Sequence, residues 1–283
     1  MSTPRFLFHA SAVGLSGEIR RPFQQNIDCQ ASTALPRHGG HAKAAIKSFE
    51  LGGVVAHSGV FTEVTGRTGP NTFETTVQAG VTGLNLEGKL KAQVLMGVIH
   101  SSHPARYPEK GEDAIEPAIS LAGTTIIGLE IGGHEIELRP LFDFSAPFTH
   151  TMTGLREYYE KDTGFRQALE SAAYSGKEEQ LPEEVRKFFP WRRRQPSAIL
   201  HRDRKMTILP LYTVVKAGPG LEVYGNVIRV PNFGRVHIGE LIIERNRRRL
   251  LMLHADLGSP CEGTVNCSCA DGNGTTDPPP DGD

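Results

Sequence analysis

The sequence contains no apolar run long enough to cross a membrane as a helix. Such a helix needs about 18 or more consecutive apolar residues, and no segment of the 283-residue chain approaches that length. A secretory signal peptide needs an apolar stretch of about 7–15 residues, whereas the apolar piece at residues 6–8 is soon interrupted by polar side chains. We therefore expect a cytoplasmic protein without a transmembrane segment.

An excess of charge of one sign is also missing. Lys and Arg number 31 against 32 Asp and Glu, which gives a formal net charge of -1 and excludes a globally basic nucleic-acid binder. Hydrophobic residues make up 38% of the chain, enough for a core, while 31 Gly and 19 Pro indicate many turns. This composition excludes a coiled coil and a wholly disordered chain.

The short motifs of common catalytic sites do not occur. The chain lacks the G-x-S-x-G nucleophile motif, a phosphate-binding G-x-x-x-x-G-K-[ST] loop, a G-x-G-x-x-G turn after a strand, and H-E-x-x-H. Only four Cys are present, and three of them (Cys261, Cys267 and Cys269) fall near the C-terminus. In the cytoplasm we expect reduced thiols. No cofactor is expected from these patterns, and they leave open whether the protein is an enzyme.

Alternating apolar and polar residues predict β-strands over most of the chain. The alternation is clear at 72–79 and 81–86, and again at 124–131 and 134–138, which flank Gly132-Gly133 as in a hairpin. A second hairpin is predicted for 236–244 and 248–255, joined by a turn at 245–247. The chain is therefore expected to be mainly β, a sandwich or barrel-like Greek-key body formed by residues 1–150 and 206–257. The alternative is two β domains.

The segments at 151–205 and 258–283 break this pattern. Thr153 can cap a helix that is interrupted at 162–164, and a second short helix is predicted between Pro182 and Pro190. We expect a helical and basic insertion at 151–205. The last segment, 258–283, is rich in Gly, Pro, Asp, Thr and Cys and is predicted to be a disordered tail.

Three strand segments resemble one another around a glycine. Residues 81–87 match 126–132, and 237–243 is a looser third copy, with Gly83, Gly128 and Gly239 at the same place in each. The spacing between copies is uneven, which argues against a solenoid or propeller. Either strands that contain a glycine look alike, or a β unit was duplicated.

Histidine is the compositional oddity, with 11 in the chain. Imidazole is a common metal ligand, and zinc sites combine close ligand pairs with ligands that the fold brings in. The pair His38-x2-His41 lies in a glycine-rich turn, and His57 follows closely. These three residues are the candidate ligands for zinc or another divalent transition metal. The alternative is that they are surface histidines without a ligand.

The segment 186–205 carries the strongest local charge. Arginine and aromatic side chains interleaved in this way could grip phosphate and stack on bases, could bind an anionic surface or an acidic protein face, or could simply form a solvated connector. The candidate partner-binding residues are Arg186, Lys187, Trp191, Arg192, Arg193, Arg194, Arg202 and Arg204.

These observations favour a non-catalytic, β-rich binding or assembly protein whose ligand the sequence does not identify. A protein partner or self-association is expected through residues 186–205. The first alternative is a metal-dependent hydrolytic enzyme with a histidine cluster on a β scaffold. The second is a nucleic-acid or anionic-surface binder that uses the same basic segment.

Overall fold

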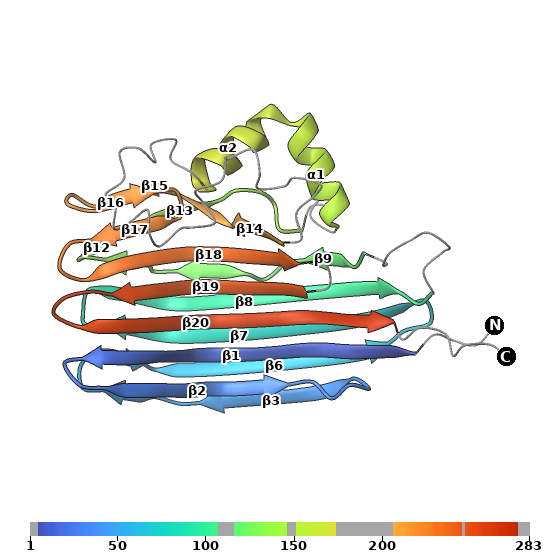
Figure 1. Ribbon diagram of the computed structural model, residues 1–283, viewed down its shortest axis with the longest axis horizontal. Helices are drawn as coiled ribbons and strands as arrows, with labels where there is room; N and C mark the ends of the chain where they lie inside the picture. Colours follow the sequence, from blue (N-terminus) through green and yellow to red (C-terminus); the bar gives the residue numbers. More distant parts are fainter. Residues whose placement is uncertain (1–4, 107–115, 146–150, 174–205, 245–246, 277–283) are drawn as a thin grey trace.

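The computed structural model describes residues 5–106, 116–145, 151–173, 206–244 and 247–276. Two large antiparallel sheets lie face to face, and a third, two-stranded sheet and a helix pair lie at one side (Figure 1). This architecture confirms the predicted mainly β, sandwich-like body with a helical insertion. No helix in the described part of the chain is long and apolar enough to cross a membrane.

The first large sheet has eight strands in the order β16-β17-β18-β19-β20-β1-β2, with β14 pairing to β18. Its first and last long strands in sequence, β1 and β20, pair along most of their length, so the start of β1 lies beside the end of β20 (Figure 1). Its strands are β1 (Phe6–Arg21), β2 (Gln25–Ala34), β14 (Met206–Pro210), β16 (Glu222–Tyr224), β17 (Val227–Val230), β18 (Gly234–Glu244), β19 (Arg247–Leu257) and β20 (Glu262–Thr276).

The second large sheet has ten strands, and β6, β7 and β8 are its long members. Its strands are β3 (Gly40–Ile46), β4 (Phe49–Leu51), β5 (Val55–His57), β6 (Gly59–Thr68), β7 (Thr72–Leu86), β8 (Leu90–Pro104), β9 (Ala118–Ser120), β10 (Thr125–Ile127), β11 (Glu130–Ile131) and β12 (His134–Glu135). The hairpin predicted around Gly132-Gly133 is confirmed as β11–β12, with both glycines at positive φ.

The predicted helix with an interruption is confirmed as α1 (Met152–Lys161) and α2 (Thr163–Ala173). The cap differs from the prediction, because Thr151, not Thr153, accepts the hydrogen bond from the Gly154 N–H. Phe165 and Leu169 are buried, and α2 packs near β14 and β15 (Figure 1). The third sheet consists of β13 (Glu137–Pro140) and β15 (Tyr212–Lys216). The second predicted helix, at 182–190, lies outside the described residues.

The prediction of a disordered tail from residue 258 is wrong for residues 262–276, which form β20 between β19 and β1. Neighbours on both sides satisfy the backbone of this strand. Its small residues also suit a close approach to the other sheet, because Gly272 faces Val77 and the Ser268 hydroxyl donates to the Ala79 carbonyl at 2.6 Å. The composition of this segment is typical of a disordered tail, but its small side chains allow the two sheets to pack closely.

A line of left-handed residues crosses the first sheet, and we call it the crease. The paired registers place Gly239, Met252, Ser268, Gly14 and Ala31 in one row across five strands. Alternate members of the row have positive φ: Gly239 53°, Ser268 56° and Ala31 49°. A left-handed residue reverses the alternation of side chains between the two faces of a strand, as in a β-bulge.

The second sheet carries a shorter line of the same kind at Gly83 and Gly128, whose φ values are 60° and 61°. Gln93 of β8 lies between these glycines in the register. The glycines shared by the three similar sequence segments are therefore the positions where a strand turns left-handed. Glycine suits these positions because a non-glycine residue costs about 1–2 kcal/mol there, a cost that Ala31 and Ser268 bear in the crease.

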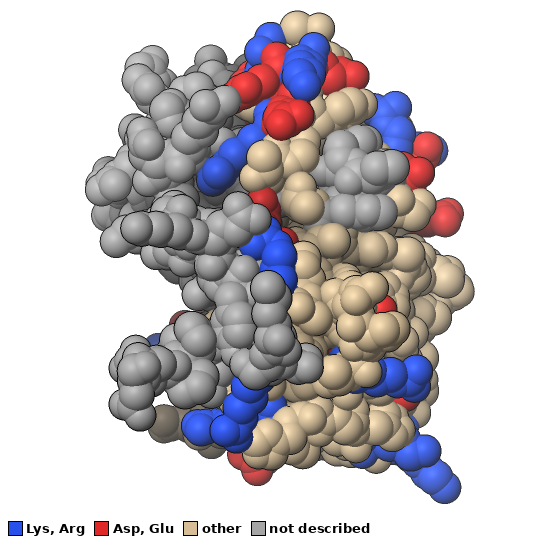
Figure 2. All heavy atoms as spheres, turned by 90° about the vertical axis from the view of Figure 1, so that its right-hand side faces the viewer, with Lys and Arg blue, Asp and Glu red and all other residues tan. Residues whose placement is uncertain are grey.

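Charged side chains of both signs are mixed on the surface of the helical end of the sandwich. Figure 2 shows Lys and Arg beside Asp and Glu at that end, with uncharged residues over much of the middle. Among the described residues on this face, we see no broad patch of a single charge. The predicted basic segment 186–205 lies outside the described residues, so its proposed role stays a prediction.

Candidate metal centre

His237, His254 and Asp256 form a compact cluster on the outer face of the first sheet. His237 lies directly opposite His254 in the register of β18 and β19, and their rings are 5.2 Å apart. Asp256 is two residues beyond His254 and therefore on the same face. One ligand atom from each residue lies within 4.8 Å of the others. Neighbouring strands thus bring two imidazoles and a carboxylate together.

The crease adds a second carboxylate to this cluster. In a regular strand, residues three apart point to opposite faces, but the left-handed Gly239 reverses the alternation between His237 and Glu240. Glu240 Oε1 consequently lies 3.8 Å from His237 Nδ1. The side chain of Asn226 donates to the same carboxylate at 3.0 Å, which fixes Glu240 beside the imidazole.

Both imidazoles direct Nε2 toward Asp256. His254 Nε2 is 3.0 Å from Oδ1 of Asp256, and His237 Nε2 is 3.7 Å from Oδ2. Each Nδ1 has an oxygen behind it: Asn266 Oδ1 is 2.7 Å from His254 Nδ1, and Glu240 lies beyond His237. Metal-binding histidines are oriented in this way, because the ring nitrogen that does not bind metal donates to a carboxylate or carbonyl.

The carboxylates dominate the electrostatics of the cluster. Burial lowers the pKa of His237, but the nearby carboxylates of Asp256 and Glu240 outweigh it, so the pKa lies above its ordinary value. Burial also disfavours the charged form of Asp256, yet the two imidazoles hold the pKa of this carboxyl well below its usual range. The Asp256 side chain therefore remains anionic at neutral pH.

The dimensions fit a divalent transition metal after a small side-chain movement. Bonds of about 2.0–2.1 Å in a tetrahedral site place ligand atoms about 3.3 Å apart. The separations of 3.0 Å to Oδ1 and 3.7 Å to Oδ2 of Asp256 lie on either side of that value, and the ligand atoms, which lie within 4.8 Å of one another, would have to draw together around an ion. The His254 and Asp256 side chains are 25% and 22% exposed, so water and ions can reach the cluster from one side.

The structure does not bring the three sequence-predicted ligands together. His38 is exposed in the turn between β2 and β3, and His41 pairs with Glu63 at 2.9 Å on the surface. His57 is buried and bonded to Gln30 at 2.7 Å. His57 lies near the end of β3 that is opposite to His41, because Ile46 at that end pairs with Val60. The five residues of strand from His41 to Ile46 span about 17 Å.

The cluster that the structure contains depends on the strand register. The predicted hairpin placed three residues in its turn, which would set His237 opposite Ala255. The structure pairs Glu244 with Arg247 instead, and this sets His237 opposite His254. A slip of one residue moves every side chain of a strand to the other face. The sequence did contain a signal for this cluster. His254 and Asp256 are two residues apart on one arm of a predicted hairpin, and His237 lies on the other arm.

Comparison with known families places this chain in one of them. A model of a domain of unknown function, DUF8256, matches residues 6–244, most of the chain. The chain therefore belongs to this family. The match includes His237 and Glu240 but ends before β19, which carries His254 and Asp256. No curated protein and no solved structure matches the chain.

Proposed function

We propose that this member of the DUF8256 family is a metal-binding protein that holds a divalent transition metal between His237, His254 and Asp256. The observation that carries the proposal is the convergence of both Nε2 atoms on one carboxylate, with an oxygen behind each Nδ1. Two imidazoles and one carboxylate suit zinc and ferrous iron.

Such a site leaves at least one coordination position for water or a ligand. Structural zinc sites have four protein ligands, whereas catalytic ones keep three and bind water at the fourth position. A bound metal would lower the pKa of that water and supply a nucleophile. The metal-dependent hydrolytic enzyme considered from the sequence is therefore proposed at this cluster, with the chain's own residues as ligands.

The test is metal binding by purified full-length protein. After purification, the metal content is measured by mass spectrometry, and zinc and ferrous iron are then titrated into chelator-treated protein. We expect one ion per chain. His254→Ala should weaken the affinity by roughly 60- to 700-fold, because a site worth about 10–16 kcal/mol with four ligands loses about 2.5–4 kcal/mol per ligand.

His41→Ala is the matched control. His41 also lies beside a carboxylate, at 2.9 Å from Glu63, and it belongs to the trio predicted from the sequence. Its replacement should leave the stoichiometry and the affinity unchanged. Loss of binding in His41→Ala but not in His254→Ala would return the site to the sequence-predicted residues. The absence of any stoichiometric ion would leave the cluster as a hydrogen-bonded network between β18 and β19.

A further inference from the structure

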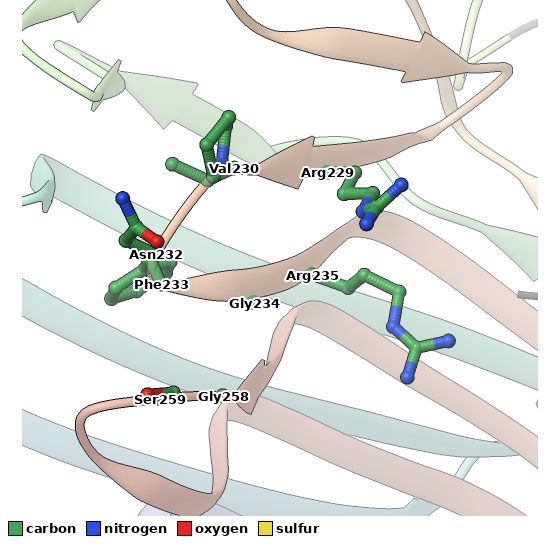
Figure 3. A pocket seen from close by; sticks show the side chains of 9 residues that line it. Arg229, Val230, Asn232, Phe233, Gly234, Arg235, Gly258 and Ser259 are labelled. Atoms are coloured by element: carbon green, nitrogen blue, oxygen red, sulfur yellow. The ribbon is translucent and has the colours of Figure 1, made fainter. Parts of the chain in front are cut away.

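A cavity of about 280 Å³ lies at one end of the first sheet, beside the candidate metal centre. Its walls come from the turn between β17 and β18 and the turn between β19 and β20, including Asn232, Gly234, Gly258 and Ser259. Arg229 and Arg235 are the charged residues among its described lining. Figure 3 shows the two arginine side chains on neighbouring strands, with that of Arg235 directed away from Arg229.

The two arginines occupy opposed positions on the strand pair. Arg229 lies directly opposite Arg235 in the register of β17 and β18, so their Cβ atoms are about 5 Å apart. Like charges at opposed positions destabilise a sheet. An anion between the two guanidinium groups would remove this repulsion and gain charge-assisted hydrogen bonds from both.

Carboxylates lie on the outer sides of the arginine pair, and one of them, Glu222, orients Arg229. On one side, Glu222 is opposite Arg229, and its Oε2 contacts Arg229 Nη1 at 3.3 Å. On the other side, Asp256 is opposite Arg235. The row across four strands therefore reads negative, positive, positive, negative. Both arginines line the cavity, and no carboxylate is among its described lining residues.

We propose that this cavity binds the phosphate group of a small molecule through Arg229 and Arg235. Guanidinium groups present paired donors that match the oxygens of phosphate. The volume is at the lower limit of small-molecule pockets, which occupy about 300–1,000 Å³, and therefore suits a compact ligand. Since Arg235 is opposite Asp256, the bound phosphate would lie next to the candidate metal centre.

A second cavity on the protein provides a contrast. It has a volume of about 250 Å³ and lies on β6 and β7 of the other sheet, where Arg67 is accompanied by Glu63 and Glu74. Its size is similar, but its charged lining residues are mainly acidic. An anion should be repelled there, and Arg67 is therefore the matched control for the arginines of the proposed phosphate site.

The experiment is isothermal titration calorimetry of the full chain with inorganic phosphate at constant ionic strength. EDTA is present throughout, so the outcome does not depend on whether the proposed metal site is correct. We expect saturable binding of one phosphate per chain. Arg229→Gln and Arg235→Gln should each weaken it at least about tenfold, as expected for the loss of charged hydrogen bonds. Arg67→Gln should leave it unchanged.

Further arms identify the source of the phosphate and guard against unfolded variants. Tighter binding of glycerol 3-phosphate than of inorganic phosphate would assign the site to a phosphomonoester, and equal binding would assign it to free phosphate. Arg235→Lys, which keeps the charge but loses the planar fork, should bind with intermediate affinity. The proposal is overturned if no phosphate binds saturably, if the arginine variants bind normally, or if acetate binds as tightly as phosphate.

Discussion

Two kinds of buried histidine occur in this protein, and their surroundings give them opposite electrostatic character. His103 lies between the sheets, only 5% exposed, with its ring 4.8 Å from that of Phe6. His237 is similarly buried at 8% exposed but lies beside Asp256 and Glu240. Burial and the nearby Arg248 charge lower the pKa of His103 to about 4, whereas the carboxylates raise that of His237.

The comparison shows that burial alone does not make a histidine a candidate ligand. His57 illustrates this, since burial lowers its pKa and its partners are an amide oxygen and the ring of Phe49. It behaves as a core residue with one hydrogen bond. His237 differs because converging oxygen and nitrogen atoms from neighbouring strands surround it, and this arrangement is the part of the site that a metal would use.

The largest effect expected from this contrast concerns the pH dependence of stability. Above pH 6.5, His103 is neutral in both the folded and the unfolded state. Between pH 6.5 and about 4, only the unfolded state takes up the proton, so the free energy of unfolding falls as the pH falls. The loss reaches about 3 kcal/mol near pH 4 and stays constant below it.

This prediction is checked by urea unfolding of the wild type and His103→Leu across pH 4–8. The difference in unfolding free energy between the two proteins removes contributions from other titrating groups. It should change by about 3 kcal/mol over the window. A pH-independent difference would show that His103 is protonated as readily in the folded protein as in the unfolded chain, and the contrast with His237 would fail.

A smaller effect is expected where the crease shapes the candidate metal centre. Gly239→Ala places a side chain at φ 53° and 2.6 Å from the Tyr212 ring. We expect the unfolding free energy to fall by about 2 kcal/mol, since the left-handed conformation costs about 1–2 kcal/mol and the contact adds to it. Metal affinity should fall as well, because Gly239 sets Glu240 beside His237.

Gly133→Ala is the control that separates the cost of the left-handed backbone from the cost of the Tyr212 contact. Gly133 also has a positive φ, 78°, but no atom lies within 4 Å of the added Cβ. Its replacement should cost only the backbone strain, about 1 kcal/mol, and should leave metal binding unchanged. Equal losses of stability in both variants, measured by urea unfolding, would mean that the Tyr212 contact and the crease have no influence of their own.

Much of the architecture could be predicted from alternation and turn chemistry, because each strand and hairpin follows from local residues. The hairpin at Gly132-Gly133 and the interrupted helix pair are examples. Residues 262–276 could not be predicted, because the small side chains of β20 only make sense against the strands on either side and the sheet beneath. The same limit applied to the candidate metal centre. Its three residues come together only because the register of β18 and β19 differs by one residue from that of the predicted hairpin.

The smallest predicted effect tests whether Asn266 orients His254 for a metal. Asn266 Oδ1 accepts from His254 Nδ1 at 2.7 Å, which keeps a proton on Nδ1, so Nε2, now 3.0 Å from Oδ1 of Asp256, is the ring nitrogen that an ion would take. Asn266→Ala should weaken zinc binding about tenfold, the lower end of the effect of such supporting residues. Asn266→Asp keeps an oxygen acceptor and should retain or raise the affinity.

Calorimetric titration of zinc into these variants and Asn266→Leu distinguishes orientation from simple packing. If Asn266 only filled space, Asn266→Leu, whose side chain branches at the same atom but has no acceptor, should bind zinc as the wild type does. If it orients the ring, the leucine and alanine variants should both lose affinity while Asn266→Asp keeps it, since the imidazole can then place its proton on Nε2. Without the Asn266 acceptor, His254 would resemble His57, a histidine held by its neighbours without an ion. The difference between these two histidines would then rest on one hydrogen bond.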